Sequence, residues 1–135
     1  MPNSSAFEQL LQAAAAQPEP QQLLFVFACA ELPADANPAQ RVRFERGQGG
    51  ALEPLACIDK RRDELSTFEA LVEESRLASP SWQVVFVAGL SGRDGQAPSS
   101  QEVDTSLNAM VEGVRRGEFR GWMTFDSQGQ PLQFS

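Results

Sequence analysis

The sequence predicts one α/β domain over residues 1–135, with an α+β arrangement as the alternative. Three observations lead to this fold class. Two short apolar runs have the length of buried strands, three serine-to-glutamate capping patterns mark helix starts, and helical segments separate the strands. A chain of this length fits a single domain and buries roughly two thirds of its unfolded surface, which is enough for a hydrophobic core.

Three main helices are predicted from capping boxes, in which a serine at the helix start is followed three residues later by glutamate. Apolar residues at helical spacing follow each box. The helices are expected over 5–17, 63–78 and 99–117, with boxes Ser5/Glu8, Ser66/Glu69 and Ser99/Glu102, an alternative cap at Asp63, and a C-terminal stop at Gly117.

The strands are predicted from continuous apolar runs and from turn residues. Leu23–Leu32 and Trp82–Leu90 have the composition of strands that are covered on both faces. Ala51–Asp59 is a weaker strand, because Pro54 lacks an N–H and indicates an edge or a bulge. Gly121–Asp126 and Gln130–Phe134 flank a short turn and predict a C-terminal β-hairpin.

The segment Pro38–Arg46 is open to two interpretations. Asn37 followed by Pro38 is typical of a helix start, whereas apolar residues that alternate with arginines would fit a strand. A short helix is preferred. Because helices separate successive apolar strands, at least one parallel βαβ unit with a right-handed crossover is expected. With the hairpin, this predicts a mixed sheet of about five strands in a two-layer or three-layer sandwich.

Charge and hydropathy restrict the partners and the location. The net charge of −7 argues against nucleic-acid binding and against a polybasic membrane-surface role. No apolar run approaches the roughly 18 residues of a membrane span. Met1–Gln17 has no basic n-region, so no signal peptide is predicted and a cytoplasmic location is expected.

The chain contains no histidine and no tyrosine. Their absence removes the usual general base, Ser-His and Cys-His nucleophiles, and most zinc ligand sets, so neither a metal nor a cofactor is expected. The sequence therefore favours a non-catalytic binding or interaction module. Two alternatives stay open: a small enzyme that uses carboxylates or a thiol, and a structural subunit of a homodimer paired through a sheet edge or the hairpin.

Two segments predict a binding site for a small anionic ligand. Three consecutive cations follow one strand, and a glycine-rich loop links another strand to the third helix, where backbone N–H groups and the helix dipole favour anions. If the strands are parallel neighbours, both segments meet at one sheet edge. The candidate residues are Lys60, Arg61, Arg62, Ser91, Gly92, Arg93, Gly95, Ser99 and Ser100. Alternatively, the loop only turns the chain and nearby carboxylates neutralise the cations.

The two cysteines, Cys29 and Cys57, lie inside apolar strand segments. Free cysteine packs as a small hydrophobic residue, so both thiols are expected to be unpaired and largely buried.

Four stretches carry a resemblance to a known family: 17–33, 49–60, 85–93 and the ending 126–134. On these residues the chain resembles a family of short bacterial proteins that are often labelled ribonucleotide reductase subunit alpha, and the likeness spans nearly the whole chain. The label implies a radical cysteine and a redox cysteine pair within a ten-stranded barrel. A chain of 135 residues with two cysteines does not supply these parts, so the resemblance implies kinship without an activity.

Overall fold

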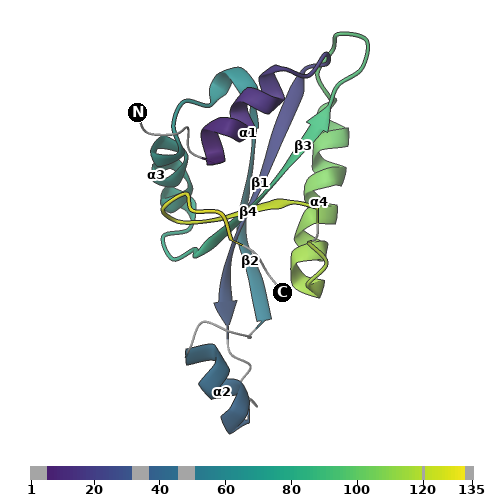
Figure 1. Ribbon diagram of the computed structural model, residues 1–135. Helices are drawn as coiled ribbons and strands as arrows, with labels where there is room; N and C mark the ends of the chain where they lie inside the picture. The colour runs from purple at the N-terminus through teal and green to yellow at the C-terminus, as the bar shows by residue number, and fades with distance from the viewer. Residues whose placement is uncertain (1–5, 32–36, 46–50, 120, 133–135) are drawn as a thin grey trace.

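The computed structural model describes residues 6–31, 37–45, 51–119 and 121–132 (Figure 1). The elements follow in the order α1 (Ala6–Ala15), β1 (Gln21–Glu31), α2 (Pro38–Glu45), β2 (Ala51–Arg61), a 3₁₀ turn η1 (Arg62–Glu64), α3 (Phe68–Ala78), β3 (Val84–Ser91), α4 (Ser100–Arg116) and β4 (Met123–Asp126). Both long apolar runs of the sequence are strands of one sheet, as predicted.

The sheet has the strand order β2-β1-β3-β4, and every neighbouring pair is antiparallel. The fold is therefore α+β, and the predicted parallel pair is wrong. Helix α3 does connect two strands that run in the same direction, but β1 lies between them and hydrogen-bonds to both. An apolar composition indicates that a strand is covered on both faces of the sheet, but it does not indicate which strand pairs with it.

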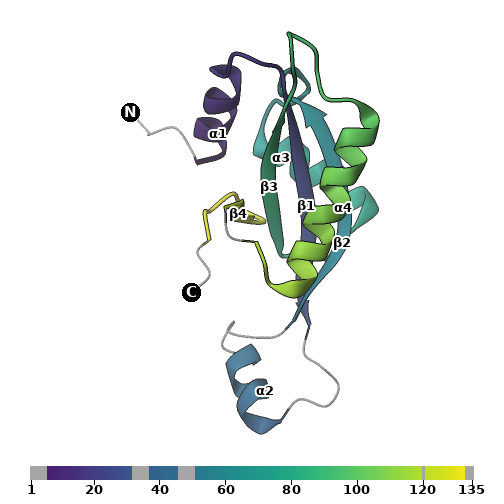
Figure 2. The same cartoon turned by 90° about the vertical axis from the view of Figure 1, so that its right-hand side faces the viewer.

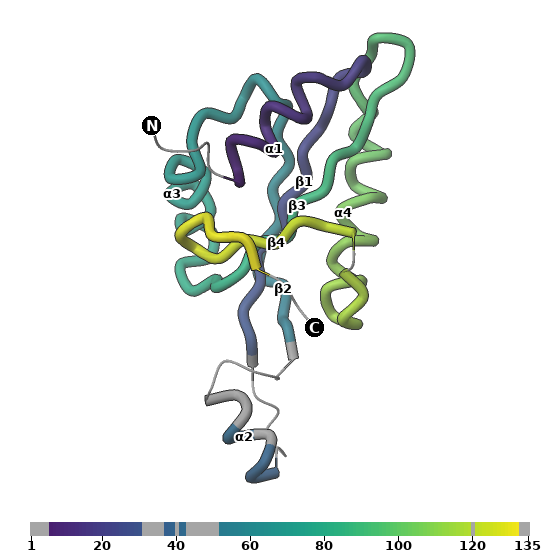
Figure 3. The backbone as a smooth tube through the Cα atoms, viewed as in Figure 1, coloured from purple at the N-terminus to yellow at the C-terminus, as the bar shows by residue number. Residues whose placement is uncertain are grey.

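Strand β2 is an edge strand with a bulge, as its proline indicated. Phe27 of β1 faces Ala56, whereas the next residue of β1, Ala28, faces Pro54, so Leu55 is the extra residue of β2. A bulge and a proline both limit further pairing on an exposed edge. Figure 3 shows the β1–β2 pair continuing beyond the rest of the sheet toward α2.

The predicted C-terminal hairpin is present only in part. The chain turns back after β4, where the Gln130 carbonyl accepts from the Asp126 N–H at 3.0 Å and the Thr124 carbonyl accepts from the Leu132 N–H at 2.8 Å. The returning arm contributes an isolated bridge between Phe125 and Pro131. The described sheet thus has four strands rather than five, and residues 133–134 of the predicted arm lie outside the described part of the chain.

Helices cover both faces of the sheet, which makes three layers (Figure 2). On one face, α1 and α3 pack on alternate residues of β1, and six buried aromatic side chains belong to this core: Phe7, Phe25, Phe27, Phe68, Trp82 and Phe125. On the other face, α4 packs on the intervening residues of β1, with its buried stripe Val103, Leu107, Met110 and Val114. The two-sided burial of β1 explains its unbroken apolar sequence.

Helix α4 begins and ends with the cap residues that the sequence predicted. Ser99 accepts from the Glu102 N–H, Glu102 returns a contact to the Ser99 N–H, and Gly117 ends the helix in a left-handed conformation with φ 73°. Helix α3 begins later than predicted because Thr67 rather than Ser66 or Asp63 caps it, accepting from the Ala70 N–H. Pro38–Glu45 is a helix, as preferred, and the Ser5 cap lies outside the described residues.

Candidate functional site

The two segments of the predicted site lie at the same end of the sheet. Strands β2 and β3 both run antiparallel to β1, so their carboxyl ends meet at the start of that strand. Arg61 and Leu90 flank Gln22 from its two sides, and Ser91 faces Gln21. The predicted convergence is thus present, although a third strand separates the two that carry it.

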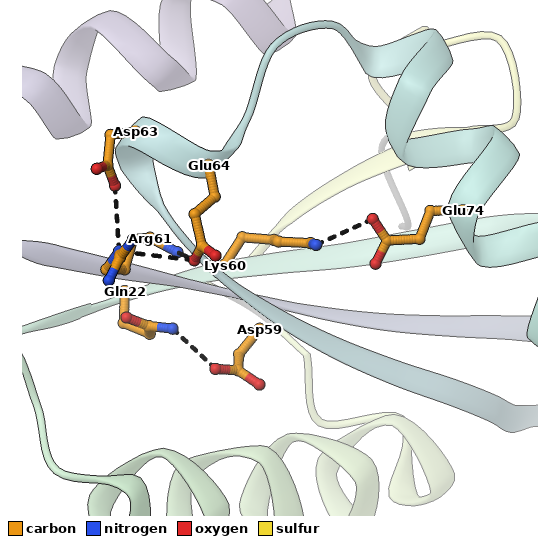
Figure 4. A network of polar contacts seen from close by, with 7 residues as sticks. All are labelled: Gln22, Asp59, Lys60, Arg61, Asp63, Glu64 and Glu74. Atoms are coloured by element: carbon orange, nitrogen blue, oxygen red, sulfur yellow. Dashed lines mark hydrogen bonds and ion pairs between the residues drawn. The ribbon is translucent and has the colours of Figure 1, made fainter.

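The three cations of the first segment make different contacts, and Figure 4 shows those of Lys60 and Arg61. Lys60 reaches across to α3, where its Nζ lies 2.9 Å from a carboxylate oxygen of Glu74. The Arg61 Nε lies 3.3 Å from Asp63 and 3.7 Å from Glu64, and its guanidinium is well exposed. Solvent-exposed pairs of this kind contribute little energy, so Arg61 can be drawn to a competing anion at small cost.

Arg62 is held differently from its neighbours. Its Nε donates a hydrogen bond of 2.7 Å to the main-chain carbonyl of Leu11, near the end of α1. No described residue accepts a hydrogen bond from its two terminal nitrogens. A guanidinium anchored through Nε presents those nitrogens as a planar fork, which matches the geometry of a carboxylate or a phosphate.

The glycine-rich loop is a tight turn rather than an open cradle. Arg93 and Gln96 exchange two main-chain hydrogen bonds of 2.9 Å, and the two residues between them, Asp94 and Gly95, have positive φ angles of 54° and 77°. This is the geometry of a two-residue Asp-Gly hairpin turn. Gly92 is required for close approach, because an added Cβ would overlap the Gln96 carbonyl oxygen.

The segment that precedes β1 already uses the N–H groups of this loop. The Gly92 N–H donates to the Pro20 carbonyl at 2.8 Å, and the Gly95 N–H donates to the carboxylate of Glu19, also at 2.8 Å. The loop therefore does bind an anionic group, and that group belongs to the chain itself. Glu19 was not among the predicted site residues. Its signal in the sequence is a carboxylate between two prolines directly before an apolar strand.

Arg93 and the start of α4 form a separate cluster. The Arg93 Nη2 lies 2.9 Å from Glu102 Oε2. Hydrogen bonds from the Ser99 backbone and side chain, together with the Arg93 charge, hold the pKa of the Glu102 carboxyl below its ordinary value of 4.5. Ser99 is occupied as the helix cap, and Ser100 is exposed on the first turn.

An open pocket of about 690 Å³ lies where α1, the 17–21 segment and η1 meet the loop. Its walls include Arg61, Arg62 and Gly95 from the predicted set, and Glu19 and Asp63 from outside that set. We call it the sheet-end pocket. The other predicted residues, Lys60, Ser91, Gly92, Arg93, Ser99 and Ser100, do not line it. Its volume is within the range of ordinary small-molecule sites.

The cysteines do not form a redox pair, and the predicted burial of both is wrong. Cys57 is exposed and Cys29 is only partly buried. Cys57 faces Val26, three residues before Cys29 on β1, which separates the thiols by about 10 Å along the strand, beyond disulfide reach. The exposure of Cys57 follows from the edge position of β2, which has a neighbouring strand on one side only.

Within the described residues, no group of three acidic, cysteine or histidine side chains is placed to hold a metal ion. Among the helices described, none has the length and apolar character needed to cross a membrane. No family model, no curated protein and no solved structure matches this chain. The kinship suggested by the sequence motifs therefore stays a prediction.

Proposed function

We propose that this protein is a cytoplasmic, non-catalytic binding module that holds a small ligand with an anionic group in the sheet-end pocket. The observation that carries the proposal is the anchored guanidinium of Arg62. Its Nε is fixed on Leu11 O, and it lines the pocket beside the exposed Arg61. Both arginines line the same pocket in a chain of net charge −7, and each can offer guanidinium N–H groups to an anionic ligand.

The direct test is a thermal-shift screen with inorganic phosphate, nucleotides and small carboxylates. A ligand at 100 times its dissociation constant stabilises the fold by about 2.7 kcal/mol, which gives a clear rise in melting temperature. Arg62→Gln is expected to remove the shift produced by the best ligand. Arg62→Lys keeps the charge but loses the planar fork, so it is expected to weaken binding as well.

Arg93→Gln is the matched control, because Arg93 is an exposed arginine at the same end of the sheet that does not line the pocket. It is expected to leave the ligand shift unchanged. If Arg93→Gln removes the shift and Arg62→Gln does not, the ligand binds at the start of α4 instead. If no compound in the screen raises the melting temperature, the pocket does not bind a simple anion of these three classes.

A structural role in a homodimer is a second candidate, favoured by the open edge of β2. The bulge and Pro54 leave only Ala56–Arg61 as a regular stretch for pairing with another copy. Pairing across a two-fold axis would give a continuous eight-stranded sheet from two four-stranded ones. Light scattering at micromolar concentration would show a dimer, and a clean monomer would exclude this role.

A further inference from the structure

The sheet-end pocket carries charges of both signs. Its walls hold two guanidinium groups, from Arg61 and Arg62, and two carboxylates, from Glu19 and Asp63. A pocket built for a bare phosphate would be expected to carry an excess of cations, because each uncompensated carboxylate repels the ligand. The balance of signs instead suits a ligand that itself carries both.

The wall formed by α1 adds negative potential on one side. Ala14 and Ala15, the last residues of the helix, line the pocket, and the last turn of α1 has no basic residue. Main-chain carbonyls at the end of a helix carry partial negative charge and lack partners within the helix. Arg62 donates to the Leu11 carbonyl, and the Ala16 and Gln17 N–H groups donate to the Gln12 and Ala14 carbonyls. The helix dipole alone therefore favours a cationic group at this side of the pocket.

The contact between Glu19 and Gly95 shows what kind of anion the other side accepts. The carboxylate of Glu19 accepts the Gly95 N–H at 2.8 Å, in an exposed position. Because this hydrogen bond is exposed to solvent, a ligand carboxylate can compete with Glu19 for the Gly95 N–H. Glu19 would then be released beside the pocket with its charge available to a cation.

We propose that the ligand is a zwitterion with a carboxylate and an ammonium group, in the class of free amino acids and short peptides. The carboxylate is held by the Gly95 N–H and the Arg61 and Arg62 guanidinium groups. The ammonium is held by the released Glu19 and by the carbonyl end of α1. This inference rests on the proposed function and narrows the chemistry of its ligand.

The test is calorimetric titration of the full chain with a matched series of probes. Trialanine has both free ends, N-acetyl-trialanine lacks the ammonium, and trialanine amide lacks the carboxylate. Trialanine is expected to bind at least tenfold more tightly than either blocked form. Free alanine, titrated in parallel, distinguishes a single amino acid from a peptide as the preferred source of the two groups.

Two variants assign the ends of the ligand. Glu19→Gln is expected to bring the affinities for trialanine and N-acetyl-trialanine close together, because the carboxylate that prefers the ammonium is gone. Arg62→Gln is expected to do the same for trialanine and its amide. Glu112→Gln, a change on the exposed side of α4, is expected to leave all affinities as they are.

The outcomes separate this inference from the proposed function. If N-acetyl-trialanine or inorganic phosphate binds as tightly as trialanine, the ligand is a simple anion; the zwitterion is then wrong and the binding module stands. If trialanine and alanine do not bind while a nucleotide from the screen does, the zwitterion is likewise wrong and the binding module stands. If neither the probes nor the screened anions bind, both proposals fall.

Discussion

The buried hydrogen bond between α3 and Trp82, two residues before β3, tests how helix packing contributes to the stability of the domain. Trp82 is 2% exposed, and its Nε1 donates to Ser75 Oγ at 2.7 Å, while Ser75 is fully buried. The serine hydroxyl donates in turn to the Val72 carbonyl at 2.8 Å. Replacing Ser75 with alanine removes the only acceptor that the described residues provide for the indole N–H.

The expected cost follows from that burial. A buried donor without a partner costs about 1–3 kcal/mol, and the lost hydroxyl leaves almost no cavity, so Ser75→Ala should destabilise the fold by about 2 kcal/mol. For a chain of this size, that lowers the melting temperature by roughly 6–10 °C. Ser66→Ala, at an exposed serine just before α3, is the control and should stay within about 0.5 kcal/mol.

The assay is urea unfolding followed by tryptophan fluorescence and circular dichroism, arranged as a double-mutant cycle. Trp82→Phe removes the indole N–H, so Ser75→Ala should cost about 1 kcal/mol less in that background than in the native chain. The slope of the free energy against urea should not change. A loss below 0.5 kcal/mol for Ser75→Ala, or an equal loss in both backgrounds, would refute the reasoning.

Three further predictions concern the site end of the sheet and the edge strand. The Ser99 hydrogen bonds lower the pKa of Glu102 in the folded protein. The stability that they add is therefore present above the ordinary pKa of 4.5 and is lost as the pH falls through the folded pKa. The difference in unfolding free energy between the native chain and Glu102→Gln, measured by urea unfolding, should close over that range. Cys57 should react rapidly with a thiol reagent in native buffer and Cys29 slowly, and equal rates would contradict the described burial. Gly92→Ala should unfold at a clearly lower urea concentration, because its Cβ has no space in the turn.

Local sequence patterns correctly predicted the features whose stabilising contacts lie within a few residues along the chain, such as helix ends. The capping box at Ser99 and the stop at Gly117 bound α4 as expected, because the groups that satisfy its ends lie within a few residues. Pro54 correctly marked an edge with a bulge. The start of α3 was placed too early, at residue 63, because Arg62–Glu64 form a separate 3₁₀ turn and Thr67, rather than Asp63 or Ser66, caps the helix.

The strand order and the composition of the pocket could not be read in the same way. Placing β1 between β2 and β3 depends on which apolar faces fit together across the whole domain, and period and composition are the same for either order. The sequence pointed to Arg61, Arg62 and Gly95 through their clustering. It missed Glu19, because this residue comes to the pocket only through the antiparallel pairing that brings the start of β1 beside the other strand ends.

The central position of β1 has a consequence for how the protein is made. Residues 21–28 of this strand pair with residues 84–91, so its second neighbour is synthesised about 60 residues after the strand itself. Until then, a nascent chain that has left the ribosome carries the apolar stretch from Leu23 to Ala28 with one side of its backbone unpaired. Non-local pairing of this kind slows folding and leaves such a segment open to association with other chains. We therefore expect chaperones that recognise extended apolar peptides to bind this chain during translation, before β3 leaves the ribosome.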